Sequence, residues 1–443
     1  MSGRSGSGVQ ATDVLVVGGG PAGSTAAALL ARKGYRVTLI EKARHPRFHI
    51  GESLLPANLP LLERLGVAQQ VREIGMQKWG AEFICPRERR HQDYRFCEAW
   101  NKSMPYAYQV RRSEFDRILI HNAARLGAEV IEGARVSAVD LGQQSAPITV
   151  QVQAEDGAAS TWRARFLVDA SGRDTFLANT LQSKRRNRQH NSAALFGHFS
   201  GARRHAGERE GHISIYWFDH GWFWFIPLSD GATSIGAVVW PYYLKRRSGP
   251  VQEFFLETIT LCPPLAERLS DARLISEVEA TGNYSYCSTR SHGRNYLLLG
   301  DAYAFIDPVF SSGVMFAMQS AFAGAEAIDN CLRTPASAAA SLRRFDRCVR
   351  HGPRQFSWFI YRLTSPTMRE MFMQPRNTLR MKEALLSLLA GDIFDSTPIW
   401  GSLWTFKLAY RLRSLLQPRR SWRARRLHRH HIQATESGPM AAG

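Results

Sequence analysis

The segment with the clearest chemical pattern is a glycine-rich turn near the amino terminus, with the spacing GxGxxG. It follows an apolar run at residues 13–17 and opens an alanine-rich stretch that predicts a helix over residues 21–33. Such glycines allow a tight turn, close approach of a pyrophosphate and close packing of helix on strand, and the helix N–H groups bind phosphate. The residues that this pattern assigns to a dinucleotide are Gly18, Gly20, Pro21, Ala22 and Gly23.

An acidic residue closes the unit that this turn begins. A second apolar run covers residues 36–40, and Glu41 follows it directly. An acid in this position binds the hydroxyl groups of a ribose, and Lys42 beside it is expected to contact the same nucleotide. Because a strand, a helix and a second strand follow in this order, the unit requires a parallel sheet.

Three further motifs accompany the glycine turn. Apolar runs end in turns with Asp and Gly at residues 166–172 and 298–302, and a helix is predicted to begin near residue 313. The pattern VxRxxFD covers residues 110–116. Together the motifs resemble the flavoprotein monooxygenase superfamily, which implies that the dinucleotide is FAD. The resemblance also implies flavin contacts from His49, Ser53, Arg112, Asp301, Pro308, Gly313 and Val314.

Two segments are similar, within this superfamily, to the flavin-dependent halogenases that act on phenols and pyrroles. Residues 222–227 read WFWFIP and match the pattern WxWxIP, and residues 75–83 hold Lys78 between apolar and small residues. The resemblance implies that halide binds at the backbone amides of Ser312 and Gly313, and that Lys78 is the catalytic residue that handles the oxidised halogen. The path from flavin to substrate is expected to be lined by Trp222, Trp224 and Phe310.

These residues also have simpler explanations. Trp222 and Trp224 point to the same side of a strand, so packing in a core would explain them, and most lysines are solvated surface charges. A buried lysine is different, because burial lowers its pKa towards the neutral amine that can react with hypohalous acid. Glu82 is equally suited to act as a base or in a surface salt bridge. Free-tryptophan halogenases carry a glutamate where this chain has Phe310, which favours an electron-rich phenol or pyrrole as the substrate.

The predicted reaction is halogenation of such a ring with FADH2, O2 and chloride or bromide, by way of hypohalous acid and Lys78. The chain has no second glycine turn of the dinucleotide-binding type, so FADH2 is expected from a separate flavin reductase. Several halogenases of this branch act on rings tethered to acyl carrier proteins, which makes an acidic carrier a further expected partner. The alternatives are an aromatic hydroxylase, a geranylgeranyl-reductase-like flavoprotein, and a flavin-binding protein without activity.

The elements that must position these residues indicate an α/β fold class. A Rossmann-like FAD-binding domain of the glutathione-reductase type is expected, with an inserted antiparallel-sheet substrate domain and a helical carboxy-terminal region. One helix is predicted after its N-cap Ser113, ending at residue 126. The expected parts are a disordered segment 1–11, the FAD-binding domain at 12–80, 105–190 and 280–335, the substrate domain at 81–104 and 191–279, helices at 336–417, and a basic, flexible tail at 418–443.

The chain of 443 residues carries 57 Lys and Arg against 38 Asp and Glu, a net charge of +19. Eight arginines and no acid lie between Arg411 and Arg429, at the end of a helix predicted over residues 399–416 that interleaves Trp and Leu with basic residues. This helix can pack on the body, make a peripheral contact with an anionic membrane, or dock an acidic carrier protein. Nucleic acid is not an expected partner, because no recognition motif accompanies the charge.

Six cysteines are scattered without a CxxC pair. They are expected to be reduced thiols, and neither a disulfide framework nor a metal site is predicted. The sequence shows no signal peptide and no apolar run of the ~20 residues that a membrane-spanning helix needs. A cytoplasmic location is therefore expected.

Overall fold

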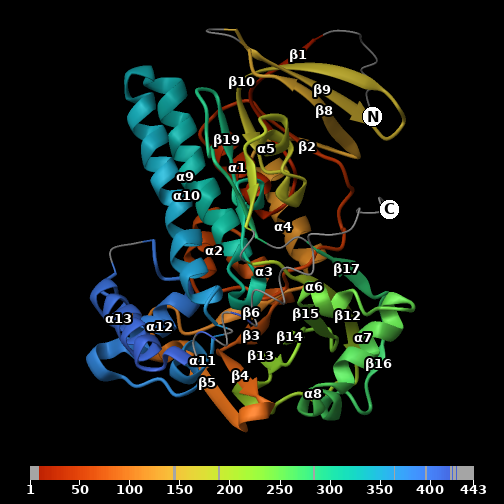
Figure 1. Ribbon diagram of the computed structural model, residues 1–443. Coiled ribbons are helices and arrows are strands. Elements are labelled where there is room, and N and C mark those ends of the chain that lie inside the picture. Colours follow the sequence, from red (N-terminus) through yellow and green to blue (C-terminus); the bar gives the residue numbers. More distant parts are fainter. Residues whose placement is uncertain are drawn as a thin grey trace.

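The computed structural model describes residues 9–142, 146–187, 190–282, 285–363, 365–394 and 397–419, with Trp422 and Arg426. Two large sheets and the helices packed on them make up this part of the chain (Figure 1). The predicted disordered residues 1–8 and most of the predicted tail 418–443 lie outside these ranges. No described helix is long and apolar enough to cross a membrane.

A largely parallel sheet forms the upper half of the molecule in Figure 1. Strands pair in parallel in the order β7-β2-β1-β10-β19, and β9 and β8 continue the sheet antiparallel from the first half of β10. Ligands of open α/β sheets bind beyond the carboxyl ends of such strands. The strands are β1 (Gln10–Val17), β2 (Val37–Glu41), β7 (Glu129–Glu132), β8 (Ala134–Asp140), β9 (Ile148–Ala154), β10 (Ala159–Asp169) and β19 (Tyr296–Leu298).

Helices bury the apolar side chains of this sheet. α1 packs between α4 and α9, and α9 runs beside α10 along one side of the molecule (Figure 1). Val14, Val16 and Leu298 from the strands and Leu30 from α1 belong to one core. The helices are α1 (Pro21–Arg32), α2 (Asn58–Leu65), α3 (Ala68–Ile74), α4 (Arg112–Arg125), α5 (Phe176–Thr180), α9 (Gly313–Arg333) and α10 (Ala338–Ile360).

A second, mostly antiparallel sheet lies in the lower half, with the order β16-β12-β15-β14-β13-β4-β5 and β17 beside β12 (Figure 1). β4 and β5 come from an early part of the chain, and β4 joins β13 in parallel. The strands are β4 (Gly80–Cys85), β5 (Arg90–Arg95), β12 (Ala193–Ser200), β13 (Ile213–Phe218), β14 (Gly221–Pro227), β15 (Thr233–Val239), β16 (Arg273–Leu274) and β17 (Glu279–Thr281).

Both faces of this second sheet are buried. Trp222, Trp224 and Ile226 of β14 belong to the core shared with the carboxy-terminal helices, whereas Phe223 and Phe225 face a third core under α7 and α8. This alternation follows from the two-residue period of a strand. α7 and α11 pack directly on strands of this sheet, and α13 packs on α11 and α12. The helices of this half are α6 (Pro241–Leu244), α7 (Val251–Thr260), α8 (Pro263–Arg268), α11 (Pro366–Met373), α12 (Met381–Ala390) and α13 (Trp400–Leu416).

Two small sheets connect the halves. β3 (Met76–Lys78) pairs with β6 (Ala107–Gln109), and β18 (Tyr286–Ser288) pairs with both β11 (Lys184–Arg186) and β20 (Ala304–Phe305). The α/β fold class, with a nucleotide-binding sheet, a second sheet and a helical carboxy-terminal region, agrees with the sequence prediction.

Two boundaries differ from the prediction. β1 begins at Gln10, which pairs with Trp162 of the long strand β10, so residues 10 and 11 belong to the sheet and not to a disordered segment. α4 begins at Arg112, and Ser113 lies inside it instead of capping it. Arg112 pairs with Asp116 one turn later, which holds the arginine in the first turn of the helix.

Candidate active site

A single cavity of about 760 Å³ extends from the carboxyl edge of the parallel sheet to β14. The glycine turn, the loop at residues 47–53, the start of α9 and the two tryptophans of β14 all line it. The predicted cofactor residues and the predicted substrate path therefore share one space. Among the predicted site residues, those that do not line the cavity are Gly23, Lys78 and Phe310.

The glycine turn forms one wall. Gly18 has φ +101°, and a Cβ there would lie 2.4 Å from the carbonyl oxygen of Ala170, so both its backbone and its surroundings require glycine. A Cβ on Gly23 would lie 1.9 Å from the Gly18 oxygen, which shows that Gly23 serves helix packing and not ligand contact. At Gly20 a Cβ would instead point into space, with Arg47 Nη2 at 3.7 Å as its neighbour. This open position at the start of α1 fits a pyrophosphate.

Glu41 is fixed beside this turn. Its carboxylate is buried at the end of β2 and accepts hydrogen bonds from the backbone N–H groups of Gly19 (2.5 Å) and Ala43 (2.9 Å). Arg47 Nε lies 3.7 Å from Glu41 Oε1. Lys42 is half exposed at the cavity rim and pairs with Asp174. The carboxylate is thus held where the ribose of a dinucleotide is bound in this fold.

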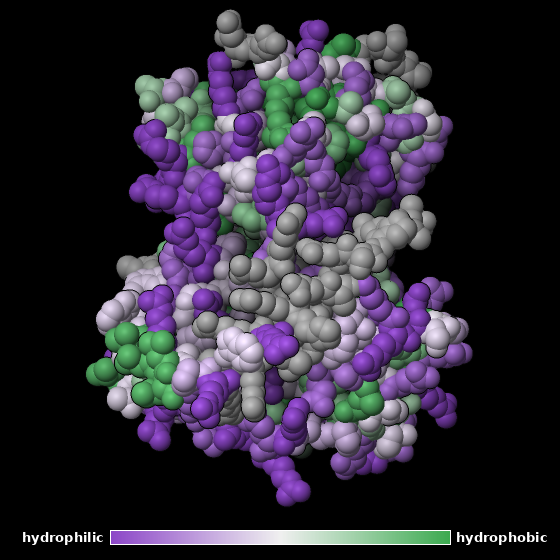
Figure 2. Space-filling view, in the orientation of Figure 1, coloured by the Kyte–Doolittle hydropathy of each residue, from purple (hydrophilic) through white to green (hydrophobic). Residues whose placement is uncertain are grey.

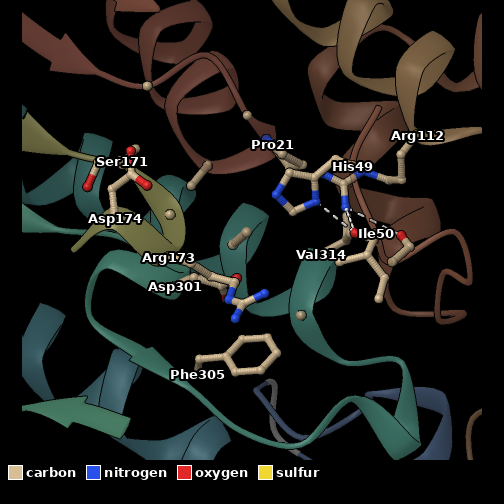
Figure 3. A pocket seen from close by; sticks show the side chains of 18 of the residues that line it. Pro21, His49, Ile50, Arg112, Ser171, Arg173, Asp174, Asp301, Phe305 and Val314 are labelled. Carbon is tan, nitrogen blue, oxygen red and sulfur yellow. Dashed lines mark hydrogen bonds between the residues drawn. The ribbon is translucent and has the colours of Figure 1, made fainter. Parts of the chain in front are cut away.

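The loop at residues 47–53 crosses the cavity and is held by α4. His49 Nδ1 lies 2.8 Å from the Ile50 carbonyl oxygen, and Arg112 Nη1 donates to the same oxygen at 2.7 Å (Figure 3). Arg112 also forms a two-point pair with Asp116. Burial, together with the charge of Arg112, lowers the pKa of His49 to about 4. His49 is therefore neutral at pH 7, and its ring faces the cavity (Figure 3).

Asp301 and Arg173 lie on another side of the same space (Figure 3). Asp301 follows β19, and burial raises the pKa of its carboxyl group to about 6 against the opposing charges of Arg173 and Arg112. Arg173 lies over the ring of Phe305 and donates to the Gly282 carbonyl oxygen. The sequence prediction included Asp301 but missed Arg173, which directly follows the Asp/Gly turn at residues 166–172.

The start of α9 has the features of an anion site. Ser312 at the N-cap forms no side-chain cap, the first turn contains no acid, and a Cβ on Gly313 would meet nothing within 4 Å. Positive charge of the helix dipole is concentrated at this end. Asp307 shapes the preceding turn by accepting hydrogen bonds from the Val309 N–H (3.1 Å) and from buried His190 Nε2 (3.0 Å). Ser312, Gly313, Val314 and Pro308 all line the cavity.

Large aromatic side chains form the opposite end. Trp222 and Trp224 are buried, with ring centroids 6.0 Å apart, and both line the cavity. Trp224 Nε1 donates to Ser234 Oγ at 3.2 Å, which fixes the ring. Phe310, predicted for the same path, points elsewhere, since its ring packs against Phe372 (6.0 Å) and Phe356 (6.2 Å) in the core.

Lys78 is buried directly behind the cavity wall. Its side chain is 1 % exposed, and Nζ donates to Ser53 Oγ (2.9 Å) and to the Leu54 carbonyl oxygen (3.0 Å). Burial lowers its pKa to about 7. A neutral amine has two N–H bonds, which match these two acceptors and leave the lone pair free for chemistry. Ser53 lines the cavity and separates Lys78 from it.

Two buried carboxylates near this wall behave differently. Glu52 lines the cavity and pairs with His198 Nε2 at 2.9 Å, an arrangement that sequence reasoning missed although His198 is a lone histidine in an apolar strand. Glu82 is also buried, but it is enclosed by His91 (2.9 Å) and His205 (2.7 Å). These partners hold the pKa of Glu82 well below its usual range, so Glu82 is an internal ion-pair centre, not a surface one.

Comparison with known proteins agrees with this geometry. Residues 11–345 match the family described as FAD binding domain. A tryptophan 2-halogenase from Chondromyces crocatus is 36% identical over 349 residues, which cover 76% of this chain and 65% of that relative. A 1H-pyrrole-2-carbonyl-[peptidyl-carrier protein] chlorinase from Pseudomonas fluorescens is 30% identical over 86% of this chain and 90% of its own. The structure of the myxobacterial chondrochloren halogenase CndH superposes with a TM-score of 0.77 at 33% identity, covering 89% and 93% of the two chains.

The fold and the open glycine positions of the cavity define an FAD-binding protein. The chain belongs to the family of flavin-dependent halogenases. FAD fits the residues present, since Gly20 and Gly313 leave space where its phosphates and its ring system need it and Glu41 presents a fixed carboxylate for its ribose.

Proposed function

We propose that this protein is an FADH2-dependent halogenase that uses O2 and chloride or bromide to halogenate an electron-rich phenolic or pyrrolic ring. One observation carries the proposal: a single cavity joins the cofactor loops to Trp222 and Trp224, and Lys78 is buried behind its wall with a pKa of about 7. In the net reaction one ring C–H bond becomes a carbon–halogen bond, and O2 is reduced to two molecules of water.

The cofactor residues bind and orient the flavin. The open turn at Gly20 takes the pyrophosphate, Glu41 the ribose, and Asp301 the ribityl chain, while His49, Ser53 and Arg112 hold the loop that covers the ring. When bound, FADH2 would supply two of the four electrons that reduce O2 to the oxidation level of water, and halide would supply the other two and become hypohalous acid. The amides of Ser312 and Gly313 hold the halide beside the flavin ring, because the start of α9 offers N–H donors and positive dipole charge.

Lys78 carries the halogen to the ring. Its neutral amine donates to Ser53 and Leu54, and its lone pair holds hypohalous acid on the far side of Ser53 from the flavin. Trp222 and Trp224 enclose the end of the cavity away from the glycine turn and exclude water there. The separation of Lys78 from the flavin keeps the aromatic substrate away from the flavin, so that the ring is halogenated and not hydroxylated.

Two partners belong to the proposal. A separate flavin reductase supplies FADH2, in keeping with the absence of a second dinucleotide turn in the sequence. The ring is either free or attached to an acidic acyl carrier protein, a choice supported by the relative that is named for a pyrrole on a peptidyl carrier protein. Another relative is named for tryptophan, so the exclusion of free tryptophan based on Phe310 stays a prediction.

The test combines the purified protein with a reductase, NADH, O2 and either chloride or bromide. Free phenols, pyrroles and tryptophan are compared with the same phenol or pyrrole acids loaded on an acyl carrier protein, and products are read by the halogen isotope pattern in mass spectrometry. The proposal expects a halogenated phenol or pyrrole and little halogenated tryptophan. Products that gain one oxygen and no halogen would identify a hydroxylase instead.

A further inference from the structure

The last described helix, α13, has apolar side chains on two opposite faces. Leu403 and Phe406 are buried and join the core with α11 and α12. The outer face carries large apolar side chains at intervals of four, four and three residues, which places them in one row on an α-helix. We call this row the outer stripe; it consists of Trp404, Leu408, Leu412 and Leu415.

The outer stripe is exposed to an unusual degree. Trp404 is 65% and Leu415 is 74% exposed, and Leu416 and Trp422 beyond them are also exposed. Figure 2 shows a group of hydrophobic side chains at the place of α13 in Figure 1, bordered by hydrophilic and intermediate residues. Single exposed leucines need no explanation, but a contiguous group of this kind marks an interaction site.

Positive charge accompanies the stripe. Arg411 and Arg419 are exposed, the first beside the stripe and the second just past the end of the helix. In the sequence, residues 397–435 contain no acid, and five further arginines follow Arg419 before residue 430. An apolar row with tryptophan, next to a run of arginines, is the composition of helices that lie in the interface of anionic membranes.

We infer that α13 is an interfacial helix, whose outer stripe enters an anionic lipid surface while the neighbouring arginines bind the headgroups. Stable attachment to a membrane surface usually needs two weak interactions together. Here the outer stripe supplies the apolar one and the arginine run supplies the electrostatic one. The buried face of α13 fixes its orientation, so the stripe is presented without any rearrangement of the fold. This inference goes beyond the proposed halogenation and does not depend on it.

Other occupants fit the surface less well. A second copy of the chain would bring Arg411 and the arginine run of both copies together, and like charges repel across an interface. An acidic carrier protein would match the arginines, yet it would have to cover a row of large apolar side chains with a surface rich in charge. An anionic lipid surface offers acyl chains to the outer stripe and negatively charged headgroups to the arginines.

The test is co-sedimentation of the full-length, FAD-loaded protein with vesicles of phosphatidylcholine alone or with about 30% phosphatidylglycerol. Binding to the anionic vesicles is expected to be at least about tenfold tighter than to neutral ones, and to weaken as salt is added. The triple variant Leu408→Gln/Leu412→Gln/Leu415→Gln should lose at least about tenfold in this affinity while FAD absorbance and the thermal midpoint stay unchanged.

A matched control variant is available on the substrate domain. Leu256, Leu261 and Ile275 are similarly exposed but lie outside α13, so Leu256→Gln/Leu261→Gln/Ile275→Gln should bind vesicles like the unmodified protein. Failure to bind anionic vesicles at low salt, or an equal loss in both triple variants, would overturn the inference. Two other results would also overturn it. One is a dimer that forms without vesicles and is abolished by the stripe variant but not by the control. The other is a stripe variant that binds vesicles normally but no longer turns over carrier-loaded substrate.

Discussion

The two ends of the cavity are built in different ways. At the cofactor end, the wall consists of backbone at Gly20 and Gly313 and of fixed charged groups such as Glu41, all from the junctions between strands and helices. At the other end, which the proposed function assigns to the substrate and which is called the substrate end, Trp222 and Trp224 extend from the middle of a strand. In the proposed function, the first end recognises the polar cofactor through backbone geometry, whereas the second encloses a flat aromatic substrate by side-chain size.

The two ends should therefore differ in how they respond to substitution. Backbone geometry tolerates little change where the glycine turn is closed, because a Cβ at Gly18 or Gly23 would collide with main-chain atoms. Side-chain size can be altered without disturbing the sheet that carries it. Changes at the cofactor end should therefore remove FAD, and changes at the substrate end should alter selectivity while FAD stays bound. Lys78 and His198 both hold the end of the loop that crosses the cavity, Lys78 through Ser53 and His198 through Glu52.

Removal of the buried Lys78 amine should have the largest effect on product formation. Lys78→Ala is expected to lower halogenated product at least about 1,000-fold, as expected for loss of a group that takes part in the chemistry. The protein should still be yellow, because Lys78 does not line the cavity. Product is measured by mass spectrometry and FAD by absorbance, with Lys382→Ala as the control, since its pair with Glu98 does not line the cavity. Undiminished product from Lys78→Ala would rule out a catalytic role for Lys78.

Loss of the Glu52–His198 pair should have the next largest effect, which is on the stability of the protein. Glu52→Leu leaves His198 buried without its partner and should reduce the free energy of unfolding by about 3 kcal/mol. The double variant Glu52→Leu/His198→Phe should recover at least half of this loss, because no polar group is then stranded. Urea unfolding of the four proteins in this cycle gives the coupling. Losses that simply add would show that the pair does not connect the loop to β12.

A side chain introduced at Gly20 tests whether FAD binds against the glycine turn. Gly20→Val should weaken FAD binding by about 2 kcal/mol, or roughly 30-fold, because the new side chain occupies ligand space. The apo protein should unfold at nearly the same temperature as the unmodified one. Fluorescence titration with FAD provides the affinity. If FAD binding is unchanged, the pyrophosphate does not lie against this turn.

The pH dependence of halogenation reports on Lys78. Because the neutral amine is the reactive form and its pKa is about 7, the rate should fall about tenfold for each pH unit below 7 and level off above it. The measurement is single-turnover halogenation with FADH2 supplied in excess. A rate that is constant from about pH 5.5 to 7, with FAD still bound, would contradict the assignment of the neutral amine.

The smallest effect is expected at the substrate end. Trp224→Phe removes the hydrogen bond to Ser234 Oγ and part of the wall, and should raise KM for the aromatic substrate about fivefold. FAD affinity should not change, which is the reverse of the result at Gly20. Trp422→Phe, on the exposed surface, is the matched control. A loss of FAD in the Trp224 variant would show that the ends are not separable.

The parts of the site that are local in the chain could be predicted. The glycine turn and Glu41 lie within one strand–helix–strand unit, so spacing alone places them. The region of Lys78 could be singled out only by resemblance. Its burial results from the pairing of β3 with β6 and from the bridge of Ser53 to Gln109, which neither spacing nor periodicity reveals.

Other features depend on contacts between distant segments. Glu52 and His198 are 146 residues apart, and no local pattern brings them together. Phe310 was predicted to line the path, but the left-handed Ser311 that follows it turns the chain (φ +55°) while the ring packs into the core. β1 extends back to Gln10 because β10 is long enough to pair with it there. Such outcomes are decided by tertiary packing and not by sequence pattern.

The parallel pairing of β4 with β13 has a consequence for synthesis of the chain. Glu82 and its partner Ser214 are 132 residues apart, so the β4–β5 hairpin leaves the ribosome long before the strand that completes its sheet. At the usual speed of translation the interval is on the order of 10 s. During that time Phe83 and the edge of β4 have no partner from β13, so this hairpin exposes an unpaired edge that a chaperone could protect.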